Sequence, residues 1–412
     1  MEGHLPPAEA VRVEEFVNYF KYDYPSPETG AFAIHLEGAP SPFGEGYYLL
    51  RVGLQGRRIS AEQRKDAVLT FVIDVSGSMA DGGRLEIVKK ALGMLVEELR
   101  PTDQVGIVVY STQARVVLQP TSASESDVIM AAINSLRPEN STNAEAGLRL
   151  GYQMASGAFR PNAINHVILC SDGVANVGQT GPDAILGEIK EYAGRDITLS
   201  TVGVGMGNYN DVLLEQLADK GNGNYAYVDT LEQAHRVLVQ NLTGMLQVIA
   251  RDAKVQVDFD PAVVSRYRLI GYENRDVADQ DFRNDTVDAG EVGAGHNVTV
   301  LYEVKLNANA QGNALTVYVR YENPETRQVN EIKQGFARSQ FASRFEATSP
   351  HFQLAAAVAE YAEILRQSYW AEGDNLENVS SLAQRVKQAL PNDADVAEFA
   401  QLVSRASQLT GH

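Results

Sequence analysis

The sequence predicts a doubly wound α/β domain that is inserted in, or flanked by, an antiparallel β-sandwich and followed by a C-terminal helical segment. Between residues 65 and 248, continuous apolar runs alternate with amphipathic stretches, which is the pattern of a buried parallel sheet covered by helices. Residues 249–345 alternate apolar and polar side chains with the period of half-exposed antiparallel strands. Residues 346–412 carry an apolar stripe at helical spacing.

The N-terminal residues, 1–64, contain one helix candidate and two strand candidates. Residues 8–22 are amphipathic, and two prolines shortly after them end the predicted helix. Strand-like runs at 32–36 and 47–54 follow, with proline and glycine between them as turn signals. Because these strands have no other partners before residue 65, we expect them to join the sandwich of residues 249–345.

The α/β region shows its strands and helices in alternation. Strands are expected at 68–74, 105–110, 115–118, 166–171, 198–204 and 225–228. Helices are expected at 85–99, 125–136, 143–157, 182–193, 209–219 and 231–247. The run at 115–118 follows the preceding strand too closely for a crossover helix, so it is predicted to be an antiparallel edge strand.

The C-terminal part changes its pattern twice. Antiparallel strands are expected at 255–259, 267–270, 298–306 and 314–321. The helical stripe that follows consists of Phe352, Ala355, Val358, Tyr361, Ala362 and Leu365. Pro391 and Asn392 separate a final helix from it.

Composition excludes several classes of function. The chain has 412 residues and a formal net charge of −18, so its surface repels phosphate backbones and argues against nucleic-acid binding. No run of 18 apolar residues is present, and no membrane span is expected. The single cysteine, Cys170, lies in an apolar strand and is interpreted as core. The chain opens without a basic or apolar leader segment, so the protein is either cytosolic or begins after a removed export signal.

Residues 71–78 contain the most informative motif. An apolar strand leads into Asp74, Ser76 and Ser78 at alternate positions, so a carboxylate and two hydroxyls are expected to converge above the strand end. Gly77 would let the backbone turn between the serines. Hard oxygen donors with few charges suit Mg²⁺, Mn²⁺ or Ca²⁺ better than Zn²⁺.

Two further residues lie where such a site needs them. Thr142 is expected to open a helix, and Asp172 ends the apolar strand at 166–171. In open α/β sheets, ligands bind outside the carboxyl ends of the strands. The alternative is that the hydroxyl residues cap helices and Asp172 begins a turn.

In this order, Asp-x-Ser-x-Ser, threonine and aspartate resemble the metal-ion-dependent adhesion site of von Willebrand factor type A domains. The resemblance implies that Ser76, Ser78 and Thr142 contact a divalent cation through their hydroxyls. Asp74 and Asp172 would bind it directly or through water. Mg²⁺ is the preferred ion, with Mn²⁺ and Ca²⁺ as alternatives, and one coordination position would stay open for the Asp or Glu carboxylate of a partner protein.

The flanks resemble bacterial type A proteins that carry a C-terminal domain of unknown function. The segments that carry this resemblance are RVEEFVNYF at 12–20, YRLIGYENR at 267–275 and DAGEVGAGH at 288–296. Members of that group carry an export or lipoprotein signal, so the resemblance implies a periplasmic or cell-surface protein whose signal has been removed. A cytoplasmic location stays open.

We expect a binding module and no enzyme. The alternatives are a divalent-metal-dependent hydrolase or phosphatase, and a structural surface protein with a stabilising metal. A phosphatase that uses Asp74 as nucleophile would need a second acid where Ser76 stands. The glycines at 203–207 are interpreted as a tight turn because their spacing misses the dinucleotide fingerprint. The acidic residues at 276–291 are interpreted as a solvated loop, with Ca²⁺ binding as the alternative.

Overall fold

The computed structural model describes residues 5–60, 62–139, 141–173, 182–205, 211–240, 242–272, 282–284, 290–371, 373 and 375–410. The chain forms two compact units. Unit 1 comprises residues 1–57, 252–288 and 296–412, and unit 2 comprises residues 58–251 and 289–295. The division expected from the sequence, at 64, 248 and 345, remains a proposal for the domain limits.

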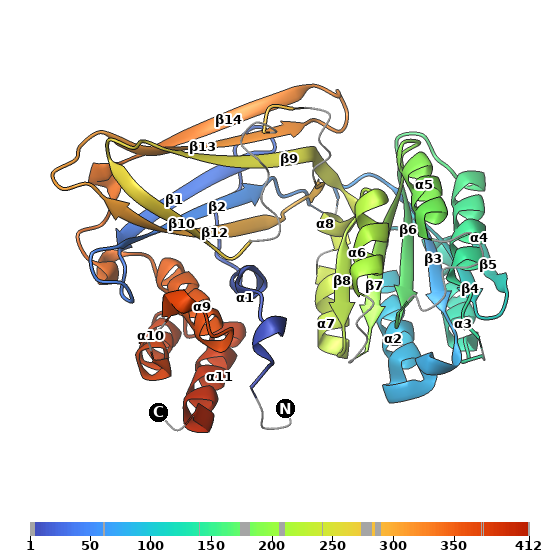
Figure 1. Cartoon of the computed structure of the whole chain (residues 1–412). Coiled ribbons are helices and arrows are strands. Elements are labelled where there is room, and N and C mark those ends of the chain that lie inside the picture. The colour runs from blue at the N-terminus through green and yellow to red at the C-terminus, as the bar shows by residue number, and fades with distance from the viewer. Residues whose placement is uncertain are drawn as a thin grey trace. The chain divides into compact units, whose positions relative to one another are not determined.

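Unit 2 contains a six-stranded sheet in the order β5-β4-β3-β6-β7-β8 (Figure 1). Its strands are β3 (Ala67–Asp74), β4 (Gln104–Tyr110), β5 (Ala114–Ser122), β6 (Ile164–Ser171), β7 (Ile197–Val204) and β8 (Tyr225–Val228). All neighbours pair in parallel except β4 and β5, which are antiparallel. The prediction of an antiparallel edge strand is therefore confirmed.

Helices cover both faces of this sheet. They are α2 (Arg84–Glu97), α3 (Ser126–Ser135), α4 (Ala144–Gly157), α5 (Pro182–Ala193) and α6 (Asp211–Lys220). Alternate residues of β3 enter different cores: Phe71 and Ile73 pack with α2 and α3, while Val72 packs with α4 and α5. This alternation explains why the strands read as continuous apolar runs, because both of their faces are buried.

Two glycines allow α4 to approach the centre of the sheet. A Cβ at Gly147 would lie 2.5 Å from the Tyr110 ring, and a Cβ at Gly151 would lie 2.3 Å from a Val72 methyl group. Larger residues would push the helix away. The N-terminus of α4 is thereby held near the carboxyl end of β3.

The last helix of unit 2 is interrupted, which corrects the prediction of one helix over 231–247. The structure has α7 (Leu231–His235), a π-helical segment (Arg236–Gln240) and α8 (Leu242–Leu246). The backbone of α8 packs closely on β11 (Val292–Gly293), where a Cβ at Gly293 would lie 1.8 Å from the carbonyl oxygen of Gly244. This tertiary contact could not be seen in the local periodicity.

Unit 1 is a β-sandwich with helices packed on it. One sheet has the order β1-β2-β12-β10, formed by β1 (Phe32–Pro40), β2 (Tyr48–Gly56), β12 (Asn297–Leu306) and β10 (Val264–Ile270). The other includes β9 (Val248–Phe259), β13 (Asn313–Glu322) and β14 (Val329–Ala337). Ring contacts join the sheets, as between Phe32 and Tyr321 at 5.1 Å. The α/β domain is thus inserted between strands of the sandwich, and the predicted fold class is confirmed.

The sequence did not predict β14, and the reason is its exposure. Its residues are mostly exposed or half-buried and include Glu331 and Lys333, so the strand lacks the apolar alternation of its neighbour β13. An edge strand with charged side chains resists pairing with other chains.

Helices complete the core of unit 1. The N-terminal stretch forms a short turn (Ala8–Ala10) and α1 (Val13–Tyr19) in place of one continuous helix. The C-terminal helices are α9 (Pro350–Leu365), α10 (Leu376–Ala389) and α11 (Ala394–Thr410), and they share one core with α1. Within the described residues, no helix has the length and hydrophobicity needed to cross a bilayer.

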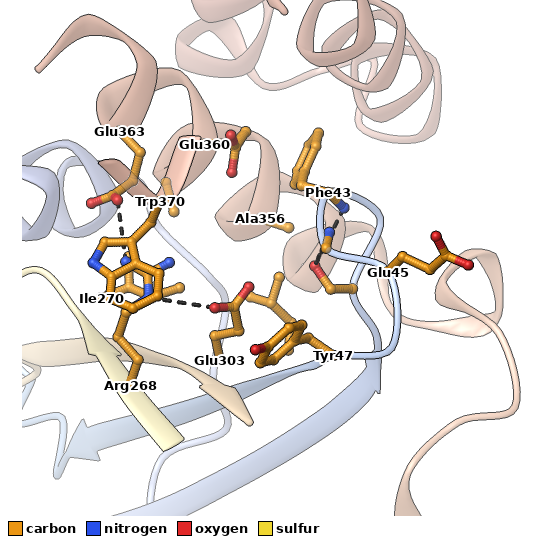
Figure 2. A pocket seen from close by; sticks show the side chains of 14 residues that line it. Phe43, Glu45, Tyr47, Arg268, Ile270, Glu303, Ala356, Glu360, Glu363 and Trp370 are labelled. Atoms are coloured by element: carbon orange, nitrogen blue, oxygen red, sulfur yellow. Dashed lines mark hydrogen bonds and ion pairs between the residues drawn. The ribbon is translucent and has the colours of Figure 1, made fainter. Parts of the chain in front are cut away.

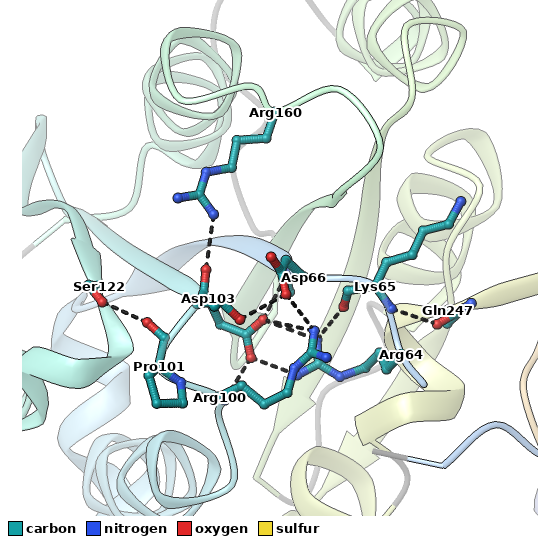
Figure 3. A network of polar contacts seen from close by, with 11 residues as sticks. Arg64, Lys65, Asp66, Arg100, Pro101, Asp103, Ser122, Arg160 and Gln247 are labelled. Carbon is teal, nitrogen blue, oxygen red and sulfur yellow. Dashed lines mark hydrogen bonds and ion pairs between the residues drawn. The ribbon is translucent and has the colours of Figure 1, made fainter. Parts of the chain in front are cut away.

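A buried ion pair anchors the first strand of unit 2 (Figure 3). Arg64 and Asp103 side chains are 2% and 0% exposed, and Arg64 Nη2 lies 2.6 Å from Asp103 Oδ2. The carboxylate also accepts the backbone N–H groups of Ala67 and Arg100, at 2.7 and 2.8 Å. One carboxylate thus joins the start of β3 to the turn before β4.

His166 gives unit 2 a defined dependence on pH. Burial lowers the pKa of His166 to about 4, from an ordinary value of 6.5. Between these values the unfolded chain binds a proton that the folded chain does not, so stability falls as pH decreases from 6.5 to 4. We expect the neutral-His166 contribution to the free energy of unfolding, roughly 3 kcal/mol, to be lost over this range.

The test is urea unfolding by circular dichroism at pH 7 and pH 4.5, with His166→Gln beside the wild type. The variant should lose less stability on acidification than the wild type. If the free energy of unfolding falls by the same amount in both proteins between pH 7 and pH 4.5, His166 does not cause this pH dependence.

Candidate metal centre

The centre begins at Asp74, the last residue of β3, whose side chain is buried. Its Oδ1 accepts the backbone N–H of Ser76 at 2.8 Å, and its Oδ2 accepts the hydroxyls of Ser171 at 2.9 Å and Tyr110 at 3.3 Å. Burial raises the pKa of Asp74, the hydrogen bonds from Ser76 and Ser171 oppose this, and the charge of Asp172 adds to the rise. The carboxylate is therefore a rigidly held, desolvated acceptor.

Ser76 and Ser78 bring their hydroxyls together. Ser76 is buried and Ser78 is exposed, and their Oγ atoms are 3.1 Å apart. Ser78 lies in a 3₁₀-helix (Gly77–Gly83), so the segment is extended only as far as Ser76. The convergence arises from this helical turn and needs no left-handed backbone at Gly77, because the positive-φ residues of the turn are Gly82 and Gly83.

Asp172 follows β6 and lies at the same edge of the sheet as Asp74, where the strands have their carboxyl ends. β3 and β6 pair in parallel with Ile73 opposite Cys170, which places Asp172 just beyond Asp74 on the neighbouring strand. The effect of its charge on the pKa of Asp74 reflects this proximity. Asp172 Oδ2 accepts a hydrogen bond from Arg84 Nη1 at 2.6 Å.

Thr142 lies on the loop before α4 and not at the helix start. The N-cap is Asn143, whose Oδ1 accepts the N–H of Ala146 at 3.1 Å. The loop is held beside Asp74 by Glu139, which donates its N–H to the carbonyl oxygen of Val75. Within the described part of the chain, no hydrogen bond joins Thr142 to the other four residues, so the structure brings together Asp74, Ser76, Ser78 and Asp172 and only places Thr142 on an adjoining loop.

Comparisons with known proteins decide the family. A model described as von Willebrand factor type A domain matches residues 69–241, one described as von Willebrand factor matches 1–51, and one for the C-terminal part of the uncharacterized protein YfbK matches 244–409. The uncharacterized protein YfbK of Escherichia coli (strain K12) is 37% identical over 436 residues, covering 99% of this chain and 75% of that protein. The chain belongs to the YfbK family. The predicted resemblance is confirmed.

Other similarities of this YfbK-family chain are more distant. Inter-alpha-trypsin inhibitor heavy chain H3 of Homo sapiens is 30% identical over 164 residues, which are 38% of this chain and 18% of that protein. Among solved structures, von Willebrand factor type A from Catenulispora acidiphila aligns with a TM-score of 0.49 and 16% identity over 90% of this chain and 89% of that one.

The donor set of this YfbK-family chain suits a hard cation. Two carboxylates and two hydroxyls gather at the ends of β3 and β6, with a third hydroxyl on the next loop. Among the described residues, no group of three or more His, Cys, Asp or Glu side chains could hold a metal. The side chains gathered here offer oxygen atoms only, a donor type that suits Mg²⁺, Mn²⁺ or Ca²⁺ better than Zn²⁺.

Sequence reasoning missed Arg84, the first residue of α2. Its Nη1 contacts both Asp172 Oδ2 and the carbonyl oxygen of Ser78, at 2.6 and 3.2 Å. Gly205, with a φ of 93°, makes room for it, because a Cβ there would lie 2.2 Å from Arg84 Nε. No motif in the sequence connects Arg84 with Asp172, which lies 88 positions away.

The sequence also singled out one cysteine, one glycine-rich segment and one acidic segment. Cys170 is buried, and burial raises the pKa of its thiol to about 12, which confirms its interpretation as core. In the glycine segment 203–207, residues from 206 lie outside the described part. The acidic segment 276–291 lies mostly outside it as well.

Proposed function

We propose that this chain is a metal-ion-dependent protein-binding module. In this proposal Asp74, Ser76, Ser78, Thr142 and Asp172 hold a divalent cation, which binds an Asp or Glu carboxylate of a partner protein. The observation that carries the proposal is the convergence of the Ser76 and Ser78 hydroxyls beside two strand-end carboxylates. Von Willebrand factor type A domains are commonly modules for metal-dependent adhesion or protein interaction.

Mg²⁺ is the ion we propose, with Mn²⁺ and Ca²⁺ as alternatives, because all three bind hard oxygen donors such as carboxylates and hydroxyls. The Ser76 and Ser78 Oγ atoms are 3.1 Å apart, so one cation would contact both hydroxyls. Because hydroxyls are neutral, the cation would keep enough charge to attract a further carboxylate.

The same geometry argues against the enzymatic alternative. Asp74 accepts three hydrogen bonds and is 0% exposed, so it is poorly placed to attack a substrate as a nucleophile. Arg84, the cation that contacts this site among the described residues, is already bonded to Asp172, so its guanidinium is not available to a transferring phosphoryl group. We therefore propose a non-enzymatic role, in an exported protein of the periplasm or cell surface.

The proposal is tested with two linked measurements on the full chain. Calorimetric titration of metal-stripped protein with Mg²⁺, Mn²⁺ and Ca²⁺ should give saturable binding that is strongest for Mg²⁺ or Mn²⁺. Immobilised protein should then retain peptides with a single Glu in Mg²⁺ and release them in chelator, while Gln-matched peptides should not bind. Retention of Glu peptides in chelator, or equal retention of the Gln peptides, contradicts the proposal.

Arg84 is expected to lower the affinity for the cation. Its positively charged guanidinium is hydrogen-bonded to Asp172 and competes with the metal for that carboxylate. Arg84→Gln should therefore bind Mg²⁺ about tenfold more tightly, which corresponds to 1.4 kcal/mol. Arg195→Gln, which removes an exposed charge on unit 2, serves as the matched control in the same calorimetric titration. Weaker binding in Arg84→Gln would mean that Arg84 positions Asp172 for the metal.

A further inference from the structure

Unit 1 contains a cavity of about 160 Å³ that is separate from the metal centre (Figure 2). It lies among the β1–β2 turn, the strands β10 and β12, the helix α9 and the 3₁₀ turn Tyr369–Ala371. A cavity of about 150 Å³ accepts a ligand the size of benzene. The space therefore suits one side chain or a molecule of about six heavy atoms.

The deeper wall of this cavity is apolar. Leu49, Ile270, Ala356 and Ala359 line it and are all buried. Phe43 and Tyr47, from the β1–β2 turn, add aromatic surface on one side. This wall suits the methylene groups of an aliphatic chain.

Carboxylates outnumber cations in the lining. Four glutamates contribute to it, against one cation, Arg268; they are Glu45, Glu303, Glu360 and Glu363. Arg268 is committed to two of them, with Nε 3.4 Å from Glu303 and Nη1 3.2 Å from Glu363 (Figure 2). When the neighbouring Arg366 and Lys305 are counted with Arg268, the four glutamates still outnumber the cations. An anion would be repelled and a cation attracted.

One buried oxygen of the lining lacks a hydrogen bond. Glu363 is 3% exposed, and its Oε1 accepts no hydrogen bond from any described residue. Arg366 Nε is 3.8 Å from this oxygen, beyond hydrogen-bonding distance, and Arg268 contacts the other carboxylate oxygen of Glu363. Leaving a buried acceptor without a donor is destabilising, so a ligand that supplies N–H groups would be stabilised there.

The rim of the cavity is aromatic and exposed. Trp370 is 58% exposed and lies over Arg268, whose Cζ is 4.8 Å from the ring centroid. Tyr369, which is 73% exposed, packs edge-on against Trp370. Exposed tryptophan and tyrosine around a pocket are typical of the energetically dominant residues of protein interfaces.

We propose that this cavity binds the side chain of a lysine from a partner protein. The methylene chain would lie along the apolar wall, the ammonium group would donate to the carboxylates, and the partner surface would cover Trp370 and Tyr369. A lysine side chain has five heavy atoms beyond Cα and fits the space, whereas the seven of arginine exceed it. This inference is independent of the metal centre and would stand if the metal site failed.

Trp370 makes the proposal directly measurable, because it is the only tryptophan of the chain. We would titrate the full chain with Nα-acetyl-lysine methylamide and follow the tryptophan emission. The expected result is a saturable change that is absent when the probe is also acetylated on Nε. Glu360→Gln should weaken binding at least tenfold, and Glu45→Gln, at the exposed mouth, by a smaller factor.

Controls separate the proposal from its rivals. Glu325→Gln removes the same charge from an exposed turn of unit 1 and should leave the titration unchanged. Circular dichroism of each variant establishes folding, and Glu45→Gln keeps the test valid if Glu360→Gln does not fold. The proposal is overturned by no saturable change, by equal binding of the Nε-acetylated probe, by tighter binding of the arginine analogue, or by tighter binding of cadaverine, a free diamine.

Discussion

Asp74→Asn is expected to weaken Mg²⁺ binding by about a hundredfold or more in calorimetric titration. The change removes one of the two carboxylates at the proposed centre but keeps the shape of the side chain. Residues that bind a metal through water or orient its ligands typically contribute 10–100-fold to its affinity, and Asp74 should contribute at the upper end of this range or above it, because it also supplies negative charge. Asparagine is preferable to alanine because Asp74 is buried and accepts hydrogen bonds that hold the loop.

The fold should survive this substitution. The asparagine Oδ1 can still accept the N–H of Ser76, and its amide group can donate to the hydroxyls of Ser171 and Tyr110, which are able to accept as well as donate. Asp81→Asn, an exposed acid on the same 3₁₀ turn, is the matched control and should bind Mg²⁺ like the wild type. An unchanged Mg²⁺ affinity in Asp74→Asn would remove Asp74 from the site.

Asp103→Ala is expected to lower the free energy of unfolding of unit 2 by about 3–5 kcal/mol, the usual cost of leaving a buried charge without its partner. It would strand the buried guanidinium of Arg64 and the N–H groups of Ala67 and Arg100 (Figure 3). This loss is a large share of the 5–15 kcal/mol that stabilises a typical domain.

Urea unfolding followed by circular dichroism measures this effect. The fluorescence emission of Trp370 reports on the unfolding of unit 1. Its unfolding transition should occur at the same urea concentration in Asp103→Ala as in the wild type. Glu191→Ala, which breaks an exposed ion pair with Arg195, is the control and should cost no more than about 0.5 kcal/mol.

A second variant isolates the stranded charge. Arg64→Met combined with Asp103→Ala should recover part of the loss, since only the two N–H groups then lack an acceptor. Full recovery would mean that those backbone bonds contribute little. A loss below 1 kcal/mol in Asp103→Ala itself would contradict the assigned role of the pair.

The residues that bear on the metal centre divide into those that local pattern revealed and those that it did not. Asp74, Ser76, Ser78 and Asp172 were predicted as ligands because they follow apolar strands, and parallel strands bring their carboxyl ends to one edge. They remain proposed ligands. The burial of Asp74 and the turn that positions Ser78 were not found. The burial of Asp74 involves Ser171 and Tyr110 on the neighbouring strands, and Ser78 lies in a 3₁₀-helix that hydrophobic periodicity does not indicate.

By itself, the sequence determined the strand and helix alternation, the inserted α/β domain, the family and the chemical type of the candidate ligands. These features are local, because burial of a strand or a helix face leaves a period in the chain that can be read directly. Only the tertiary structure decided the pairing of Arg84 with Asp172, the Arg64–Asp103 ion pair and the glutamate-lined cavity of unit 1. Each joins residues far apart in sequence, and such contacts depend on strand order and close packing, which no local pattern encodes.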